Sequence, residues 1–449
     1  MRPSPMKFVD LAANRHIPIL LEMIRAITSA ASPRETLELF VAAMRKAYGG
    51  RCYIHVSVAD LPPGHFRVTR WLDRSGVEHV PPAAFDSVSI ARVPIVSGGL
   101  VGELISTPGP KLLHELAIRD DAAFGDRLSG YGSLMAIPLL EQGRITSWVL
   151  LLEPDAHGIS MDDLEDAIVQ ANLLALAIDH QLIAARLRIA QAEIDREVEQ
   201  IAEIQRALLP TTLPNVPGLT IAASYRTFDR AGGDYYDVYP VGRSRAERVA
   251  AAADDRWAIM IADASGHGPS AAVVAAMVNA ILHTFPTEPR GPSEVLEYLN
   301  RHLHDRGFGG AFVTAFLAFY DPADRSFTFA NAGHNPPLLR PNGVGAAPVL
   351  LEEVGGLPLG IEERVDSGEH TIRLEPGQTI VLYTDGVVDE RCIDQTAFGL
   401  ERLSRLVERF DGTVGELVDH INEQLVAHQG PTLPEDDQTL VVVRMMPAR

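Results

Sequence analysis

The sequence predicts a multidomain α+β protein, in which a smaller helix-and-strand domain is joined by a helical coiled-coil linker to a larger domain of packed sheets. The chain has 449 residues, more than one domain usually holds, and 46% of them are apolar, enough for two cores. A long helical pattern without Pro or Gly separates two regions of strand-like patterns. We therefore expect four segments, namely an N-terminal helical segment (1–30), a first domain (31–180), the linker helix (181–210) and a second domain (211–449).

The first domain combines helices with an antiparallel sheet. Helical patterns occupy residues 17–27 and 32–49, and the second begins with Ser32 as its cap. An amphipathic helix capped by Ser160, with acidic residues in its first turn, closes the domain. Alternating apolar runs predict strands at 52–60, 65–73, 133–140 and 145–154.

The order of these elements resembles that of a GAF domain. The resemblance covers about residues 31–180 and rests mainly on SLMAIPLLEQGRITSWVLLLEP followed by GISMDDLEDAIVQANLLALAI. It implies a sensor domain that receives a small-molecule or protein signal. The irregular stretch around RVPIVSGGLVGELISTPGP contains no motif that identifies a ligand.

Beyond the first domain the chain continues as a helix up to Pro210. Apolar residues recur there with a four–three spacing that shifts phase once, and most other positions are charged or small. Sustained heptads without caps predict a coiled coil with a stutter, and hence a homodimer formed through the linker. A single amphipathic helix packed on its own domain is the alternative. The predicted seam comprises Ile178, Leu182, Ala185, Ile189 and Ala192, followed by Ile194, Val198, Ile201, Ile204 and Leu208.

Charge and cysteine content narrow the kinds of partner. A formal net charge of −20 repels phosphate backbones and anionic lipid surfaces, so we expect no nucleic acid and no membrane insertion. Hard cations suit such a chain better. Cys52 and Cys392, its two cysteines, allow neither a zinc motif nor a disulfide framework. The N-terminus lacks the apolar core of a signal peptide and no run approaches a membrane span, which predicts a cytoplasmic protein.

Beyond Pro210, short apolar runs alternate with turns that contain Gly and Pro. Strand-like runs such as WAIMIADAS, AFVTAFLAFYD and TLVVVRMM are interrupted by helix-like ones such as GPSAAVVAAMVNAILHTF and LERLSRLVERF. Strands with inserted helices predict two packed sheets covered by helices. The alanine-rich stretch RVAAAADDRW is expected to be a hairpin loop.

Aspartates in the second domain recur where an apolar strand meets a turn. Asp234 follows two glycines, Asp263 ends WAIMIAD, and Asp385 ends TIVLYTD. Asp436 and Asp437 stand just before QTLVVVRM. Each alone reads as a turn aspartate that bonds nearby amides. Together they suit a hard divalent cation, which needs carboxylate oxygens converging from different segments, with glycines leaving room beside them.

The stretch DASGHGPSAAVVAAM adds detail around Asp263. The main-chain oxygen of Ala264 would face the same space and could serve as a ligand. A serine nucleophile elbow is a weaker interpretation, because Ser265 lacks the G-x-S-x-G frame and no persuasive Asp/His pair follows. His267 remains open between an acid, a phosphate contact and a turn residue that packs locally.

Six motifs stand in order along residues 200–446, namely EIQRALLPTTLP, GGDYYDVY, DASGHG, NAGHNPPLL, LYTDGVVDE and DDQTLVVVR. Together they resemble the SpoIIE/RsbU class of bacterial PPM-type, metal-dependent protein serine phosphatases. The resemblance implies an αββα sandwich with two Mn²⁺ or Mg²⁺ ions between its sheets. Carried onto this sequence, it makes Asp263 a bridge between the ions. Asp385, Asp436 and the Ala264 carbonyl would hold the first ion, and Asp234 the second.

The same resemblance implies the reaction and the partner. Water activated by the two ions would hydrolyse phosphoserine without a protein nucleophile. The substrate would be a phosphorylated STAS-type anti-anti-sigma protein in a partner-switching pathway. Two other functions remain as alternatives. GGDYYD partly matches a diguanylate cyclase signature, although no acid follows GGD, and a catalytically silent scaffold could share the fold.

The linker helix leads directly into the catalytic motifs. This continuity suggests that a signal in the GAF-like domain changes the packing of EVEQIAEIQRALLP. We hypothesise that this packing decides whether Asp234 and Asp263 bind metal together.

Overall fold

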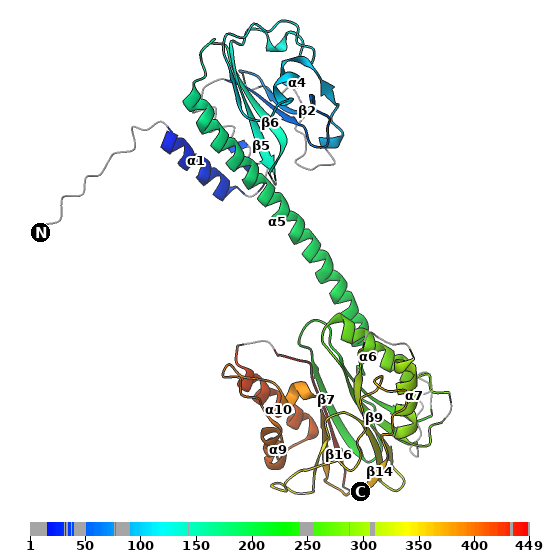
Figure 1. Cartoon of the computed structure of the whole chain (residues 1–449). Helices are drawn as coiled ribbons and strands as arrows, with labels where there is room; N and C mark the ends of the chain where they lie inside the picture. The colour runs from blue at the N-terminus through cyan, green and yellow to red at the C-terminus, as the bar shows by residue number, and fades with distance from the viewer. Residues whose placement is uncertain are drawn as a thin grey trace, which may run out of the picture. The chain divides into compact units, whose positions relative to one another are not determined.

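The structure is a computed structural model of the chain. It describes residues 16–30, 32, 35–36, 38–39, 51–75, 77, 90–141, 143–242, 255–286, 288–305, 310–431 and 434–447. The chain divides into two compact units, Met1–Gln191 and Ala192–Arg449. Figure 1 labels the elements of both, and each unit has its own sheets and hydrophobic core.

The N-terminal unit is built on a six-stranded antiparallel sheet with the order β3-β2-β1-β6-β5-β4. Alternate residues of β5 face two cores: Leu134 packs with Phe66 and Trp148 on one face, and Met135 packs with Leu164 of the long helix on the other. The strands are β1 (Cys52–Ser57), β2 (His65–Leu72), β3 (Val96–Ser97), β4 (Lys111–Leu113), β5 (Ser133–Glu141) and β6 (Arg144–Glu153).

The helices of this unit largely follow the sequence pattern. Helix α1 (His16–Ser29) confirms the first predicted helix, whereas the one predicted at 32–49 lies mostly outside the described residues. Short helices α4 (Gly99–Ile105) and η1 (Asp126–Leu128) occur in the irregular crossover. The Ser160 cap is also confirmed, because its Oγ accepts the Asp163 N–H at 3.1 Å.

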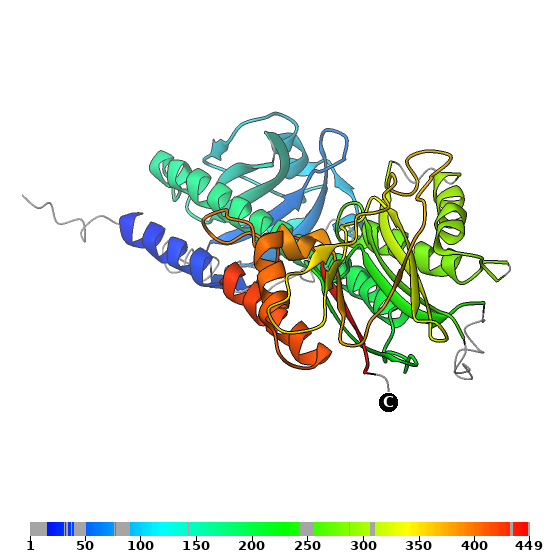
Figure 2. The ribbon, with the colours of Figure 1, turned by 90° about the horizontal axis from the view of Figure 1, so that it is seen from below.

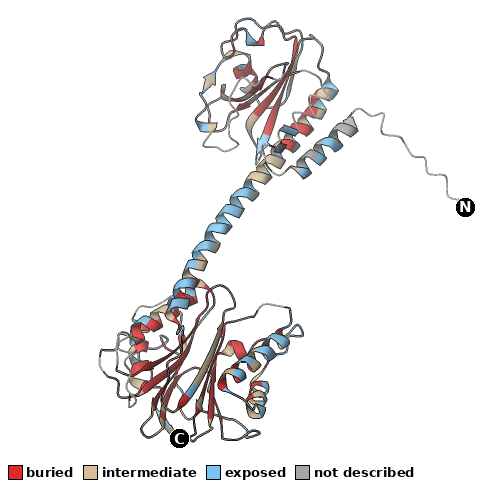
Figure 3. Cartoon of the chain, turned by 180° about the vertical axis from the view of Figure 1, so that it is seen from behind, coloured by how far each residue is buried: buried red, intermediate tan, exposed pale blue. Residues whose placement is uncertain are grey.

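Helix α5 (Met161–Leu208) is continuous over 48 residues, which confirms a helical linker. Its middle is exposed, seen as the pale-blue stretch in Figure 3. Near its end Ala202 and Gln205 are buried. Among the described residues, α5 is the helix that is long and apolar enough to cross a membrane by length and composition. The same helix packs Leu164, Ala167 and Ala171 into a protein core.

The C-terminal unit contains two five-stranded antiparallel sheets. The first has the order β14-β11-β10-β9-β8, and helices α6 (Pro269–Leu282) and α7 (Pro292–His304) pack on it. Pro269 and Pro292 stand at the helix starts, where a missing N–H costs no bond. The strands are β8 (Asp234–Pro240), β9 (Trp257–Ala264), β10 (Val313–Asp321), β11 (Ser326–Ala332) and β14 (His370–Arg373).

The second sheet has the order β13-β12-β15-β16-β7. Helices α9 (Leu400–Arg409) and α10 (Val414–Gln429) pack on its outer face, while its inner face meets the first sheet in one large core. Figure 2 shows α9 and α10 in orange and α6 and α7 in yellow-green on opposite sides of the sheets. The remaining elements are β7 (Leu219–Arg226), β12 (Leu338–Arg340), β13 (Val349–Leu350), β15 (Thr379–Tyr383), α8 (Asp385–Val388) and β16 (Gln438–Met445).

The described residues therefore form the four layers that the resemblance implies, helices, sheet, sheet and helices. The strand-like and helix-like runs of the second domain are confirmed as strands and helices. One local difference is Asp385, which begins the one-turn helix α8 rather than ending the preceding strand. The hairpin loop predicted for RVAAAADDRW lies almost entirely outside the described residues.

Candidate metal centre

Two of the predicted acids face each other across the first sheet. Asp234 is the first residue of β8 and is directly opposite Asp263 in the antiparallel β8–β9 ladder. Opposed residues in such a ladder point to the same face, and like charges there are destabilising. The pair therefore needs a proton, a cation or hydrogen-bond donors to be stable.

Donors for Asp234 come from the second sheet. Its Oδ2 accepts the hydroxyl of Thr384 at 2.8 Å and that of Thr439 at 2.6 Å, and the carboxylate is buried. Burial, followed by the charge of Asp263, raises the pKa of Asp234 well above its usual range, and the Thr439 bond opposes that rise. Asp234 thus links the two sheets at the point where the acids gather.

Asp263 lies at the centre of the acidic group. Burial and the charges of Asp385 and Asp436 raise its pKa to about 8, while a hydrogen bond with Asp234 acts in the opposite direction. Burial and the charge of Asp436 also raise the pKa of Asp385. The structure therefore brings together all four predicted acids, although more than 100 residues separate Asp234 and Asp263 from Asp385 and Asp436.

The four described carboxylates do not form a complete set of metal ligands by themselves. Within the described part of the chain, no three His, Cys, Asp or Glu side chains converge closely enough to hold an ion by themselves. The donor set still fits a hard divalent cation, because it consists of carboxylate oxygens beside a main-chain carbonyl. A Cβ on Gly233 would lie 2.6 Å from the Ala264 oxygen, so glycine keeps that carbonyl uncovered.

Asp437 has a different role from its neighbour. Its Oδ1 accepts the Phe228 N–H at 2.9 Å and its Oδ2 accepts the Gly233 N–H at 2.5 Å. A Cβ on Gly232 would lie 2.3 Å from the same carboxylate. Asp437 therefore holds the loop that leads to Asp234. The half-buried Asp436 instead accepts the N–H of the next residue, Asp437, at its Oδ1.

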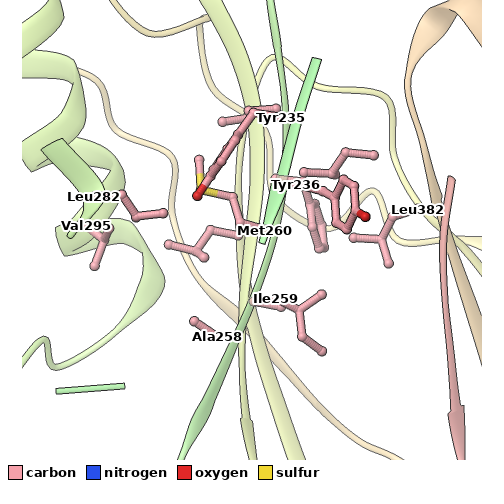
Figure 4. Packing of buried hydrophobic residues seen from close by; sticks show 14 of the residues in the cluster. Tyr235, Tyr236, Ala258, Ile259, Met260, Leu282, Val295 and Leu382 are labelled. Carbon is pink, nitrogen blue, oxygen red and sulfur yellow. The ribbon is translucent and has the colours of Figure 1, made fainter. Parts of the chain in front are cut away.

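Residues on the opposite face of β8 stabilise the fold. Asp237 accepts the Tyr235 hydroxyl at 3.0 Å and contacts His283 Nε2 at 2.9 Å. Figure 4 shows Tyr235 on the side of Leu282 and Tyr236 on the side of Leu382. The alternation along the strand thus directs Asp234 and Tyr236 between the sheets, and Asp237 toward the helices.

The structure gives the other sequence candidates local roles. Ser265 Oγ accepts the Phe312 N–H at 2.9 Å, and the Ser265 N–H donates to the Phe312 carbonyl, which is a turn contact and not a nucleophile–base pair. The exposed ring of His267 packs edge-on against Phe228, with the ring centroids 5.3 Å apart.

Sequence reasoning missed the residues that support the acids. Thr384 and Thr439 are adjacent to motif acids in TDG and DDQT, yet a threonine in a buried strand has no distinctive pattern. Gln205 was also missed. Its Oε1 accepts the Gly232 N–H at 3.0 Å and its Nε2 donates to the Gly232 carbonyl at 2.6 Å. The last turns of α5 are therefore bonded to the loop before Asp234.

Known proteins with similar sequences share the region that carries these acids. A family model described as Stage II sporulation protein E (SpoIIE) matches residues 253–446. The phosphoserine phosphatase RsbU of Bacillus subtilis (strain 168) is 33% identical over 261 residues, or 58% of this chain and 72% of the relative. This chain belongs to the SpoIIE/RsbU class of PPM-type protein serine/threonine phosphatases.

Two further proteins are similar to parts of this chain. The phosphoserine phosphatase RsbP of Bacillus subtilis is 27% identical over 198 residues, which are 43% of this chain and 45% of RsbP, so this chain matches less than half of that protein. The SiaA-PP2C domain of Pseudomonas aeruginosa has a TM-score of 0.46 and 22% identity, covering 57% of this chain and 98% of that one. The SpoIIE family match contains Asp263, Asp385 and Asp436 and begins after Asp234. As a PPM-type phosphatase, the chain uses divalent cations.

Proposed function

We propose that this chain is a two-cation phosphoserine phosphatase whose ions are held by Asp234, Asp263, Asp385 and Asp436. The observation that carries the proposal is the opposition of Asp234 and Asp263 in one ladder, with Asp385 and Asp436 close enough to raise the pKa of Asp263. Asp263 would bridge two Mn²⁺ or Mg²⁺ ions. One ion would also be held by Asp385, Asp436 and the Ala264 carbonyl. The other ion would also be held by Asp234.

Bound divalent cations would lower the pKa of water and neutralise charge on the phosphoryl oxygens. The chain's own residues prepare the site for this chemistry. Thr384 and Thr439 hold the Asp234 carboxylate from the second sheet, and Asp437 fixes the loop before it. Because the two threonine hydroxyls and the Asp437 carboxylate are buried, they stay in place when no substrate is present.

The proposed substrate is phosphoserine on a STAS-type anti-anti-sigma protein, in a cytoplasmic partner-switching pathway. Two relatives named phosphoserine phosphatase, RsbU and RsbP, support the phosphoserine assignment. A net charge of −20 supports a protein partner over a nucleic acid.

Substitution of Asp385 tests the proposal against a silent scaffold with the same fold. Hydrolysis of p-nitrophenyl phosphate with Mn²⁺ should be linear for the full chain and should fall by roughly a thousandfold for Asp385→Asn, because several kcal/mol of cation stabilisation are lost. Asp394→Asn, on an exposed acid nine residues later, is the matched control. Absence of turnover together with absence of Mn²⁺ binding in calorimetry would instead favour the scaffold.

We also propose that the N-terminal unit is a GAF-like sensor and that α5 pairs in a homodimer. Exposed apolar residues on α5 keep heptad spacing, which supports the pairing. Apart from Ile194, they differ from the predicted seam, which is partly covered near Ile178 and Leu182, where Gln181 bonds to Ala30 and Thr36, although its Ile189 and Ile204 are exposed as well. The exposed stripe comprises Val169, Leu173, Leu176, Ile183, Leu187 and Ile194.

A charge introduced into the stripe should separate the dimer. Leu187 is 65% exposed, so Leu187→Glu should cost little in the single chain but should place two buried charges in the pair. Sedimentation velocity should then give a monomer for Leu187→Glu and a dimer for the wild type. Ala185→Glu, on the predicted seam, is the comparison. A monomer from Ala185→Glu and a dimer from Leu187→Glu would assign the original seam instead.

A further inference from the structure

The motif NAGHNPPLL lies between β11 and β12, and the proposed function gives it no role. Its first residues form a closed turn. Asn331 Nδ2 donates to the His334 carbonyl at 2.9 Å, and the His334 N–H donates to Asn331 Oδ1 at 2.8 Å. Gly333 in this turn has φ +71°, and a Cβ there would lie 2.7 Å from the Pro358 ring. Glycine is therefore required, and the turn holds His334 in one place.

The turn places the imidazole against β10. His334 is only 5% exposed, and its Nδ1 lies 2.8 Å from Thr314 Oγ1. Thr314 is directly opposite Asp263 in the β9–β10 ladder, as Asp234 is in the β8–β9 ladder. Opposed residues share a face with Cβ atoms roughly 4.5–5.5 Å apart. One row across three neighbouring strands therefore consists of Asp234, Asp263 and Thr314. His334 contacts this row at Thr314, the residue without a charge.

The environment of His334 restricts what it can bond. Burial lowers its pKa to about 4, against a smaller opposing effect of the Tyr383 main chain, so the ring is neutral near pH 7. Its Nε2 has no partner of good hydrogen-bond geometry among the described residues. Among the described residues, the bond to Thr314 is therefore the side-chain hydrogen bond that the His334 ring makes. This bond limits rotation of the threonine hydroxyl.

A bridging carboxylate must present its two oxygens to two different ions, so its orientation has to be set by its neighbours. In the two ladders Asp263 is directly opposite a second acid, Asp234, on one neighbouring strand and directly opposite Thr314 on the other. We propose that Thr314 and His334 are positioning residues for Asp263: His334 donates its Nδ1–H to Thr314 Oγ1, so that the threonine hydroxyl can donate its own proton to the Asp263 carboxylate and help to fix it. The inference rests on the proposed function, because it concerns the same site.

Substitutions in the full chain test this pair through metal binding as well as turnover. Thr314→Val removes the hydroxyl at nearly constant shape. It should weaken Mn²⁺ binding in calorimetry and lower kcat for p-nitrophenyl phosphate, each by roughly 10- to 100-fold, as loss of an outer contact to a metal ligand does. KM should change little, and Thr314→Ser should restore most of both. His334→Leu should match Thr314→Val, and the double variant should lose no more than either single one.

Thr328→Val is the matched control, because Thr328 also bonds across strands, to Thr371 at 2.9 Å, but in an exposed position. Wild-type Mn²⁺ affinity and kcat in Thr314→Val would overturn the inference. The inference would also be overturned if a lower melting temperature in EDTA were the only effect of Thr314→Val. Losses of Mn²⁺ affinity and kcat that add up in the double variant would overturn it too. A wild-type chain that binds no Mn²⁺ and shows no turnover would overturn the proposed function as well, whereas an active wild type with an unaffected Thr314→Val would overturn the inference alone.

Discussion

Asp234→Ala is expected to lose one of two bound cations and nearly all turnover while the fold remains intact. Asp234 would be the carboxylate of the second ion, and loss of that ion removes several kcal/mol of transition-state stabilisation, or roughly a thousandfold in rate. Calorimetry with Mn²⁺ should show the stoichiometry fall from two to one. Hydrolysis of p-nitrophenyl phosphate measures the loss of turnover in the same sample.

The fold should survive because the Asp234 carboxylate is itself under electrostatic strain. Burial and Asp263 raise its pKa in the folded chain. An acid whose pKa is raised by folding binds more protons when folded, so it destabilises the fold increasingly as the pH rises above its unfolded pKa. In EDTA at pH 8, relief of this buried charge should offset the loss of the bonds from Thr384 and Thr439, so Asp234→Ala should melt close to the wild type. Mn²⁺ should stabilise the variant less than it stabilises the wild type.

Asp237→Asn is the matched control for this substitution. Asp237 is on the same strand but faces Tyr235 and His283 on the helix side. Its loss should lower the melting temperature and leave two cations bound. If Asp234→Ala still binds the wild-type number of ions, Asp234 is not a ligand and the second ion must be held elsewhere.

The second large effect is expected from Gln205→Leu in the last turns of α5. This change removes both bonds to Gly232 and leaves the buried Gly232 N–H and carbonyl without a partner. An unsatisfied buried polar group costs about 1–3 kcal/mol, so the loop should shift to reach other partners. Because Gly233 and Asp234 follow directly, we expect Mn²⁺ affinity and kcat to fall by roughly 10- to 100-fold.

Gln200→Leu provides the comparison, since Gln200 lies on the same helix but is exposed. Both variants should remain helical by circular dichroism. Equal Mn²⁺ affinity and kcat in the two variants would show that α5 does not act on the metal centre through Gln205. A defect confined to Gln205→Leu would support control of the acids by the packing of the linker, as the sequence hypothesis requires.

Much of the candidate site could be predicted from short stretches of sequence. A buried apolar strand that ends in an acid before a glycine-containing turn is a local pattern, and it identified Asp263 and Asp385. Ordered motifs supported the family, which the similarity to RsbU then established. The local pattern alone does not choose between Asp436 and Asp437, because both adjacent acids fit it equally well, and only the resemblance favours Asp436.

The tertiary structure supplies the evidence for that choice. Asp437 is committed to the amides of Phe228 and Gly233, which are more than 200 residues earlier in the chain, and Asp436 is not. Gln205 likewise occupies what the sequence shows as a polar position on an amphipathic helix. Its bond to Gly232 appears only when the helix end packs on the loop.

The sequence by itself determined the helical linker, the strands and helices of both domains, and the four acids, since each depends on the periodicity or type of neighbouring residues. Only the tertiary structure decided which polar side chains support those acids. Thr384 and Thr439 bond to Asp234 from separate segments, and Thr314, which bonds to His334, is placed opposite Asp263 by strand register. Such contacts depend on strand register and sheet packing, which are set by the whole core, so no short stretch of sequence records them.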